Sequence, residues 1–265
     1  MNNIIDFIDS NPETITDWVT EFFAGKYSRT EVADYLYKVD AEGMPRRGVV
    51  QLASEFNALE EKSTESIKQW YTNTDFYVFD LLPWNGCSMF KEKAEQIVKL
   101  IKERNYTSIV DFGGGLGVLS IYIKTMLPDC TVHYVDLKDG VTFQFAQFLM
   151  QKYNVRDDVH VMDDEAFFAS DVTVDCILAT DCFEHIPNMD EVFGKLTAHS
   201  YNIYHDSTFF SDKWSPQHVY TPTGLQFLNM TALYNYLPNG SPMLLTRAYL
   251  QYDTTGQLQV KFATV

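Results

Sequence analysis

The chain is poor in basic residues and in cysteine, and it has no long uninterrupted hydrophobic run. Its 265 residues carry 20 lysines and arginines against 36 aspartates and glutamates, which gives a formal net charge of −16. A field of that sign repels nucleic-acid phosphates and anionic lipid, so neither nucleic acid nor a membrane surface is an expected partner. The four cysteines form no Cys-x-x-Cys pair, which excludes a finger-type metal site and favours buried thiols.

No apolar stretch is long enough to span a bilayer, and the first residues lack the basic and apolar regions of a signal peptide. We therefore expect a cytoplasmic protein. The composition, 46% hydrophobic and 21% charged, is ordinary for a folded globular chain. Aromatic residues reach 15%, enough to line an enclosed pocket.

Two kinds of periodicity divide the chain near residue 88. Before it, apolar residues recur at helical spacing, and the predicted helices cover 11–25, 28–39 and 49–70. An apolar segment at 75–86 follows, and we expect Pro83 and Gly86 to break it. Because no Gly/Ser-rich linker intervenes, residues 1–88 are predicted to form a helical cap that packs directly on the remainder.

From residue 89 to 265, short β-branched runs alternate with helices of ten to fifteen residues, which indicates βαβ units. The predicted strands are TSIVDF, CTVHYVDL, DVHVMDD, VDCILAT and YNIYHD. A helix over 223–237 and two terminal β runs joined around 254–256 complete the pattern. The expected fold is α/β: a doubly wound, seven-stranded, mainly parallel sheet with an antiparallel C-terminal hairpin.

The most informative segment is a glycine-rich turn between a strand and a helix, with Asp111, Gly113, Gly115 and Gly117 at alternate positions. Glycine allows positive φ and close approach of the backbone to a ligand, so the turn predicts a nucleotide-type site. A dinucleotide fingerprint would need Gly or Ala where Val118 stands, and the Gly-Lys-Ser/Thr of a phosphate loop is absent. The alternative is a tight turn with a purely structural role.

The spacing Asp-x-Gly-x-Gly-x-Gly resembles the first motif of the class I S-adenosylmethionine (SAM) dependent methyltransferases, and the resemblance covers residues 90–265 in element order. It implies a Rossmann-like fold with SAM as cofactor, held in part by Asp111, Gly113, Gly114 and Gly115. SAM carries a sulfonium cation and no phosphate, which suits a turn without Lys or Arg. Residues 111–200 hold 15 acidic and 5 basic residues, so the turn lies in the most acidic part of the chain.

An aspartate closes the second predicted strand, 23 residues after Gly113. This Asp136, followed by Leu137, can accept hydrogen bonds from both ribose hydroxyls. NAD-binding folds place an acid similarly, and Asp136 also has an alternative role as the N-cap of the next helix. The resemblance implies that Asp163, with Asp164 in reserve, meets the adenine amino group. For both of these a solvated loop is the alternative.

The fourth predicted strand leads into Asp181-Cys182-Phe183-Glu184-His185. The resemblance implies that Asp181 and Cys182 lie against the methionine part of SAM. His185 has three interpretations: it caps a loop in the pocket wall, it acts as a general base, or it joins Asp181 and Glu184 in binding a divalent cation. In the last case His205 or His218 would complete the ligand set. We expect no resident metal.

Three further features are candidates. The segment from Tyr71 to Leu82 resembles one that precedes the core in some family members, which implies that Tyr71 or Tyr77 lies near the cofactor carboxylate or sulfonium; core packing is the alternative. Tyr77 and His218 are also catalytic candidates, and for His218 a loop histidine bonded to backbone is the alternative. The patch from Pro45 to Gly48 could bind a substrate carboxylate or phosphate, against a solvated helix start. The family's Pro-Gly-Gly turn before the fifth strand is replaced by Ala198-His199-Ser200.

The predicted function is in-line methyl transfer from SAM to an N, O or C nucleophile of a small organic molecule, as in small-molecule biosynthesis. A protonated nucleophile would need a base, and His185 and His218 are candidates because histidine titrates near neutral pH. One alternative keeps SAM but transfers the aminocarboxypropyl group or cyclises it, releasing methylthioadenosine. Another is a non-catalytic SAM-binding or partner subunit.

Overall fold

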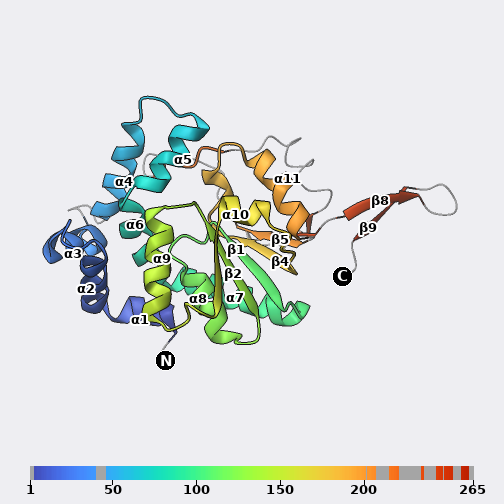
Figure 1. Cartoon of the computed structure of the whole chain (residues 1–265), viewed down its shortest axis with the longest axis horizontal. Helices are drawn as coiled ribbons and strands as arrows, with labels where there is room; N and C mark the ends of the chain where they lie inside the picture. The colour runs from blue at the N-terminus through green and yellow to red at the C-terminus, as the bar shows by residue number, and fades with distance from the viewer. Residues whose placement is uncertain are drawn as a thin grey trace.

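The computed structural model describes residues 3–39, 46–200, 202–206 and 215–220, together with the backbone of short strands at 234–235, 243–246, 248–252 and 258–262. At its centre lie five parallel strands in the order β3-β2-β1-β4-β5 (Figure 1). They are β1 Ser108–Phe112, β2 Thr131–Asp136, β3 Val159–Asp163, β4 Cys176–Ala179 and β5 Asn202–His205. The five parallel strands predicted from β-branched runs are confirmed.

Helices cover both faces of this sheet. Successive side chains of β1 alternate between two hydrophobic clusters, with Ile109 in one and Val110 in the other. Helices α7 Ser88–Arg104, α8 Val118–Met126 and α9 Val141–Lys152 contribute to the first cluster, and α10 Asp164–Ala169 and α11 Met189–His199 contribute to the second. Parallel strands buried on both faces read as continuous apolar runs, which is why the sequence showed them clearly.

The C-terminal prediction needs correction. Strand β7 Met243–Thr246 pairs antiparallel with β5, and β6 Tyr234–Asn235 pairs with the other edge of β7. The predicted hairpin forms from β8 Ala248–Tyr252 and β9 Leu258–Phe262, but as a separate two-stranded sheet. The helix predicted over 223–237 is wrong at residues 234–235, and its other residues lie outside the described part of the chain.

The N-terminal region is helical, as predicted. Its helices are α1 Ile4–Ser10, α2 Pro12–Phe22, α3 Arg29–Tyr37, α4 Arg47–Asn57, α5 Thr64–Asn73 and α6 Phe76–Gly86. The single helix predicted over 49–70 is wrong, because the Ser63 side chain accepts the N–H of Ser66 and starts a new helix. Pro83 does not break the apolar segment either, since α6 continues through it to Gly86.

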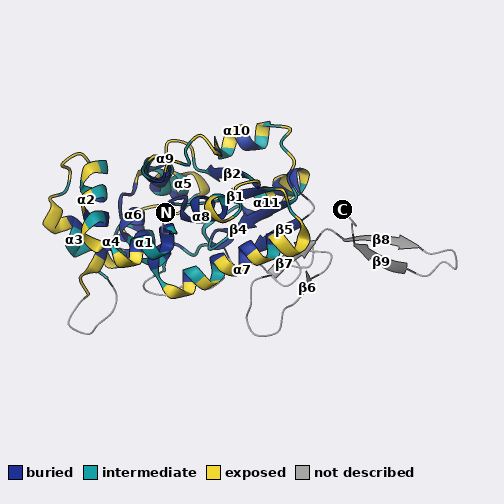
Figure 2. Cartoon of the chain, turned by 90° about the horizontal axis from the view of Figure 1, so that it is seen from below, coloured by how far each residue is buried: buried dark blue, intermediate teal, exposed yellow. Residues whose placement is uncertain are grey.

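These helices share a hydrophobic cluster with the α/β body. The buried residues Ile4, Ile5 and Ile8 of α1 belong to the same cluster as α8 and α9, and the rings of Phe22 and Phe145 lie 4.8 Å apart. Figure 2 shows the buried residues running through the described helices and the sheet. The division at residues 88 and 89 stays a prediction; in the structure it falls at the start of α7.

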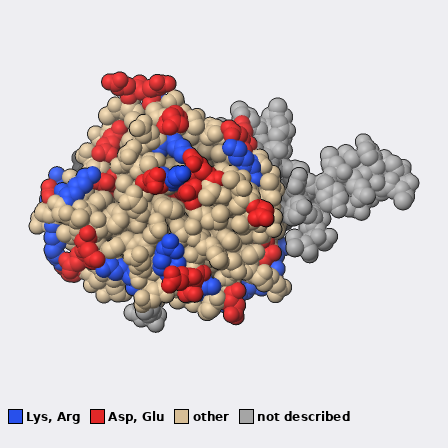
Figure 3. Space-filling view, viewed as in Figure 1, with Lys and Arg blue, Asp and Glu red and all other residues tan. Residues whose placement is uncertain are grey.

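The surface carries many acidic groups, several of them in ion pairs. On the face shown in Figure 3, basic side chains are scattered among acidic ones and form no stripe. Within the described residues, every helix is too short or too polar to cross a lipid bilayer.

Candidate functional site

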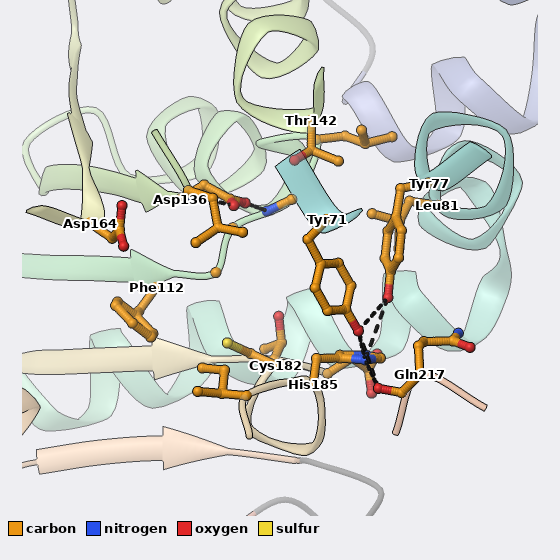
Figure 4. A pocket seen from close by; sticks show the side chains of 18 of the residues that line it. Tyr71, Tyr77, Leu81, Phe112, Asp136, Thr142, Asp164, Cys182, His185 and Gln217 are labelled. Atoms are coloured by element: carbon orange, nitrogen blue, oxygen red, sulfur yellow. Dashed lines mark hydrogen bonds between the residues drawn. The ribbon is translucent and has the colours of Figure 1, made fainter. Parts of the chain in front are cut away.

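A cavity of about 700 Å³ lies at the carboxyl ends of β1, β2 and β4, beneath helices α5 and α6 (Figure 4). Connections at this edge of a parallel sheet are where α/β folds bind ligands. The body lines it with the glycine turn, Asp136, Leu137, Asp164, Cys182 and His185, and the N-terminal helices line it with Arg46, Lys68, Tyr71, Tyr77, Asp80 and Leu81. The volume suits a nucleoside and a small second molecule together.

The glycine turn approaches its neighbours too closely for side chains. A Cβ on Gly113 would lie 2.3 Å from the Cys182 sulfur, and one on Gly114 would lie 2.8 Å from the Tyr134 ring. Gly113 has φ +66° and Gly115 has φ +54°, which only glycine adopts readily. The three glycines therefore leave a turn of bare backbone lining the cavity, which an adenosyl ligand can approach closely.

Asp111 supports this turn from below and does not line the cavity. It is buried, and its Oδ2 accepts a hydrogen bond from the Ser120 hydroxyl at 2.7 Å. Oδ2 also lies 3.0 Å from where a Gly114 Cβ would be. Burial raises the pKa of the carboxyl to about 6. Asp111 is thus placed to position the glycine turn, and its predicted direct contact with the cofactor has no support in this geometry.

Asp136 is held rigidly at the end of β2 and faces the cavity. The Gly115 N–H donates to Oδ2 and the Leu137 N–H donates to Oδ1, both at 2.6 Å. Tyr134 Oη lies 3.4 Å from Oδ2 but donates its one proton to the Gly115 carbonyl at 2.7 Å. Each carboxylate oxygen therefore keeps a further lone pair, so two ribose hydroxyls could be accepted as predicted. Burial raises the pKa of Asp136 to about 7, and the two backbone donors oppose that shift. The N-cap of α9 is Gly140, so the alternative role for Asp136 is wrong.

Asp163 and Asp164 occupy different environments. The Asp163 side chain caps α10 by accepting the Ala166 N–H at 2.7 Å, and it lies outside the cavity lining. Asp164 lines the cavity and pairs with Lys68 of α5 at 2.9 Å. Of the two predicted adenine contacts, only Asp164 is in a position to make one.

Asp181 and Cys182 follow β4 and line the cavity beside the glycine turn. Asp181 takes a positive φ of 45° and pairs with Lys93 at 2.9 Å. Lys93 also pairs with Asp206 at 2.6 Å, so one lysine bridges two carboxylates. Burial raises the pKa of the Cys182 thiol well above its usual range, so this sulfur stays protonated.

A cluster of rings and a backbone carbonyl forms the opposite end of the cavity (Figure 4). Tyr71 Oη lies 2.9 Å from His185 Nδ1 and donates to the Gln217 carbonyl at 3.2 Å. Tyr77 Oη lies 3.4 Å from both Tyr71 Oη and His185 Nδ1. The His218 ring centre is 4.8 Å from that of His185. Segments more than a hundred residues apart therefore meet here.

His185 differs from the predicted general base. Burial and the neighbouring His218 lower its pKa to about 3, so the imidazole is neutral at physiological pH and a weak proton acceptor. Burial raises the pKa of Tyr77 well above 10, so this phenol remains a donor and is no base. The prediction that His185 titrates near neutrality is wrong, because the sequence did not reveal its burial.

One group of side chains could hold a cation. Ligand atoms of Glu184, His185 and His218 all lie within 4.8 Å of one another. Asp181, which the metal interpretation included, is not in this group and pairs with Lys93. His205 lies elsewhere, with its ring 5.3 Å from that of Phe183.

Sequence reasoning missed several residues that line the cavity from the N-terminal helices. Lys68 carried no motif, Asp80 and Leu81 lay in the predicted segment from Tyr71 to Leu82 with no role assigned to them, and the arginine patch was treated as one unit. The structure separates its members: Arg46 lines the cavity, and Arg47 is exposed and pairs with Asp34. Periodicity placed these residues on helices without showing which helix face covers the site.

The fold and the residues that line the cavity agree with the comparison to known families. Residues 110–200 match the family model described as a methyltransferase domain. No curated protein sequence matches the chain.

Three solved structures share the fold, and the chain covers roughly two thirds of each. PigF with S-adenosylhomocysteine (SAH) is 11% identical, covering 76% of this chain and 69% of that one, with a TM-score of 0.54. The mitomycin 7-O-methyltransferase MmcR is 10% identical, with coverages of 75% and 66% and a TM-score of 0.52. Human N-acetylserotonin methyltransferase in complex with SAM is 12% identical, with coverages of 76% and 63% and a TM-score of 0.52.

The strand order, the glycine turn and the family match together define a class I SAM-dependent methyltransferase domain. The protein is accordingly a SAM-dependent transferase, as its first motif indicated.

Proposed function

We propose that the protein transfers a methyl group from SAM to a hydroxyl oxygen of a small, largely apolar organic molecule. The observation that carries this proposal is the cavity between the strand ends and helices α5 and α6, which joins the glycine turn to the Tyr71–Tyr77–His185 cluster. A cavity of this size suits a small-molecule ligand. Two of the similar structures bear the names of methyltransferases acting on small molecules, which supports the same substrate class.

The nucleoside would lie along the strand ends. Asp136 would accept the ribose hydroxyls, Asp164 would meet the adenine, and the Gly113–Gly115 backbone would pass beneath the sulfur. Bound SAM supplies a methyl group that its sulfonium already activates. The chain therefore has to align the two reactants and keep water out. Alignment of this kind contributes substantially to the rate of a two-reactant step.

The acceptor hydroxyl must lose its proton as the new bond to carbon forms. His185 is neutral with a pKa of about 3, so we assign it an orienting role through Tyr71 and the Gln217 carbonyl. His218 lines the cavity beside it and is the proposed proton acceptor. The helices α5 and α6 would close the site and select the acceptor.

Product analysis tests the proposal. The purified protein is incubated with SAM and a panel of phenols, alcohols and amines, and the nucleoside products are separated. Formation of SAH together with a methylated hydroxyl compound supports it. Release of methylthioadenosine would instead show aminocarboxypropyl transfer or cyclisation, and turnover confined to amines would refute the oxygen acceptor. The Asp136→Asn variant is the control for background decomposition of SAM.

A further inference from the structure

Two charged residues of the N-terminal helical region lie in the cavity without a role in the site described so far. Arg46 and Asp80 both line it, with side chains that are only 28% and 23% exposed. Arg46 precedes α4 as its N-cap residue and Asp80 lies within α6, so both come from the N-terminal helical region. If Arg46 and Asp80 contact the cofactor, the N-terminal helices contribute to the cofactor site as well as to the acceptor site.

Their place along the cavity follows from the strand order. If Asp136 at the end of β2 holds the ribose and Asp164 after β3 lies toward the adenine, the other end of the nucleoside extends over β1 and β4. Leu81, next to Asp80, has its Cδ1 3.2 Å from where a Gly115 Cβ would be. Asp181, which follows β4, lines the cavity as Asp80 does, and its charge adds to the raised pKa of the Asp80 carboxyl.

The contact between Arg46 and Asp80 is incomplete. One terminal guanidinium nitrogen of Arg46 donates to the Asp80 main-chain carbonyl at 3.2 Å, but it lies 3.6 Å from the carboxylate oxygen. The Arg46 Nε is buried and has no hydrogen-bond partner among the described residues. Burial raises the pKa of the Asp80 carboxyl to about 6 even though Arg46 opposes that shift. Both charges therefore retain bonding capacity.

The other charged groups at this end are already paired. Lys93 lies within 2.9 Å of Asp181 and 2.6 Å of Asp206, and it also lies over the Trp84 ring. This arrangement leaves Arg46 and Asp80 as a cation and an anion, side by side, with unfilled bonding capacity. A ligand group that carries one positive and one negative charge complements such a pair.

We propose that Arg46 and Asp80 bind the amino-acid end of the cofactor, with the guanidinium on its carboxylate and the Asp80 carboxylate on its ammonium. This inference rests on the proposed use of SAM by the cavity. It explains why Arg46 is turned inward while the adjacent Arg47, 55% exposed, pairs with Asp34 on the surface. Cofactor binding would also link α4 to α6, since each helix would hold one end of the zwitterion.

The test is isothermal titration of two nucleosides with three proteins. SAH carries the amino-acid end, and methylthioadenosine has the same adenosine and thioether without it. For Arg46→Met we expect SAH to bind about 10- to 100-fold more weakly, the range for losing one charge-assisted hydrogen bond. Methylthioadenosine should bind within twofold of the wild-type value, and this unchanged binding also reports that the variant is folded.

The matched control is Arg47→Met, which removes the same charge one residue away and should leave both affinities within twofold. Equal weakening of both nucleosides by Arg46→Met, or no weakening of SAH, would overturn the inference while leaving the proposed cofactor intact. If the wild-type protein binds neither nucleoside, the proposed function fails and the inference fails with it.

Discussion

The two ends of the cavity are built in different ways. The nucleoside end consists of strand ends and backbone: the Gly113–Gly115 turn, with Asp136 fixed by two main-chain N–H groups at 2.6 Å. The acceptor end consists of side chains from distant segments, such as Tyr71 and His185, which are 114 residues apart. A contiguous strand-turn-helix holds the first, and only tertiary packing holds the second. Substitutions at the two ends should therefore have different effects on cofactor affinity, stability and acceptor turnover.

The largest effect is expected at Asp136. Asp136→Asn keeps the shape but replaces an acceptor-only carboxylate with an amide, so one ribose hydroxyl loses its partner and a charge-assisted bond is lost. We expect SAH affinity to fall by about 100-fold, measured by titration calorimetry. Asp163→Asn is the control, since Asp163 caps α10 outside the cavity and should change affinity less than about threefold. Equal losses in the two variants would contradict the ribose assignment.

The second-largest effect is expected at the glycine turn. Gly113→Ala puts a Cβ 2.3 Å from the Cys182 sulfur at a φ of +66°, so we expect the free energy of unfolding to fall by about 1–3 kcal/mol. SAH binding should weaken as well, because the loop must shift. Gly194→Ala is the matched control: Gly194 lies in α11 with nothing within 4 Å of its added Cβ. That variant should gain about 0.5–1 kcal/mol in urea denaturation. A neutral Gly113→Ala would show that the turn is not constrained.

The third expectation concerns pH. Burial raises the pKa of Asp136 to about 7, and the ionised carboxylate is the better ribose acceptor. Roughly one tenth of the group is ionised at pH 6 and nine tenths at pH 8, so SAH should bind about tenfold more tightly at pH 8. Titrations from pH 6 to 8 check this. In Asp136→Asn most of the slope should disappear, leaving about the twofold change expected from Asp80, whose carboxyl has a pKa of about 6.

The same group affects stability with the opposite sign. The folded protein keeps the Asp136 proton between about pH 4 and 7, where the unfolded chain has lost it, so this contribution to stability falls as pH rises through 7. A wild-type SAH affinity that is flat with pH would contradict the assigned role of Asp136.

The smallest effects are expected at the acceptor end. Tyr71→Phe removes the contact at 2.9 Å with His185 and the hydrogen bond to Gln217, and should lower stability by about 1 kcal/mol. SAH affinity should change little, while kcat/KM for the acceptor falls. Tyr77→Phe removes only contacts at 3.4 Å and should cost less on both measures. If Tyr77→Phe proved the more damaging, the proposed orienting role of Tyr71 would be wrong.

The difference between the two ends also explains how far the sequence could lead. The nucleoside end was predictable because Gly113, Gly115 and Asp136 sit at fixed places in successive βα units, so local pattern and strand order bring them together. Position in a motif did not separate Asp163 from Asp164, since cap and cavity wall are adjacent residues.

The rest depends on packing that no local pattern encodes. The sequence named Tyr71, Tyr77, His185 and His218 but did not reveal that the first three share one hydrogen-bonded cluster, or that burial lowers the pKa of His185 to about 3. In the same way it could not show that Arg46 faces inward while Arg47 faces Asp34. In the fold, the break between α4 and α5 was missed because residues 60–66 are polar and contain no glycine or proline to mark it.

The most direct test of the central claim is a crystal structure of the protein grown with SAH. We predict that the ligand's ribose hydroxyls bond to the Asp136 carboxylate and that its adenine points toward Asp164, with the sulfur above the Gly113–Gly115 turn. A cavity that stays empty at saturating ligand, or one that takes up a dinucleotide in its place, would contradict the account.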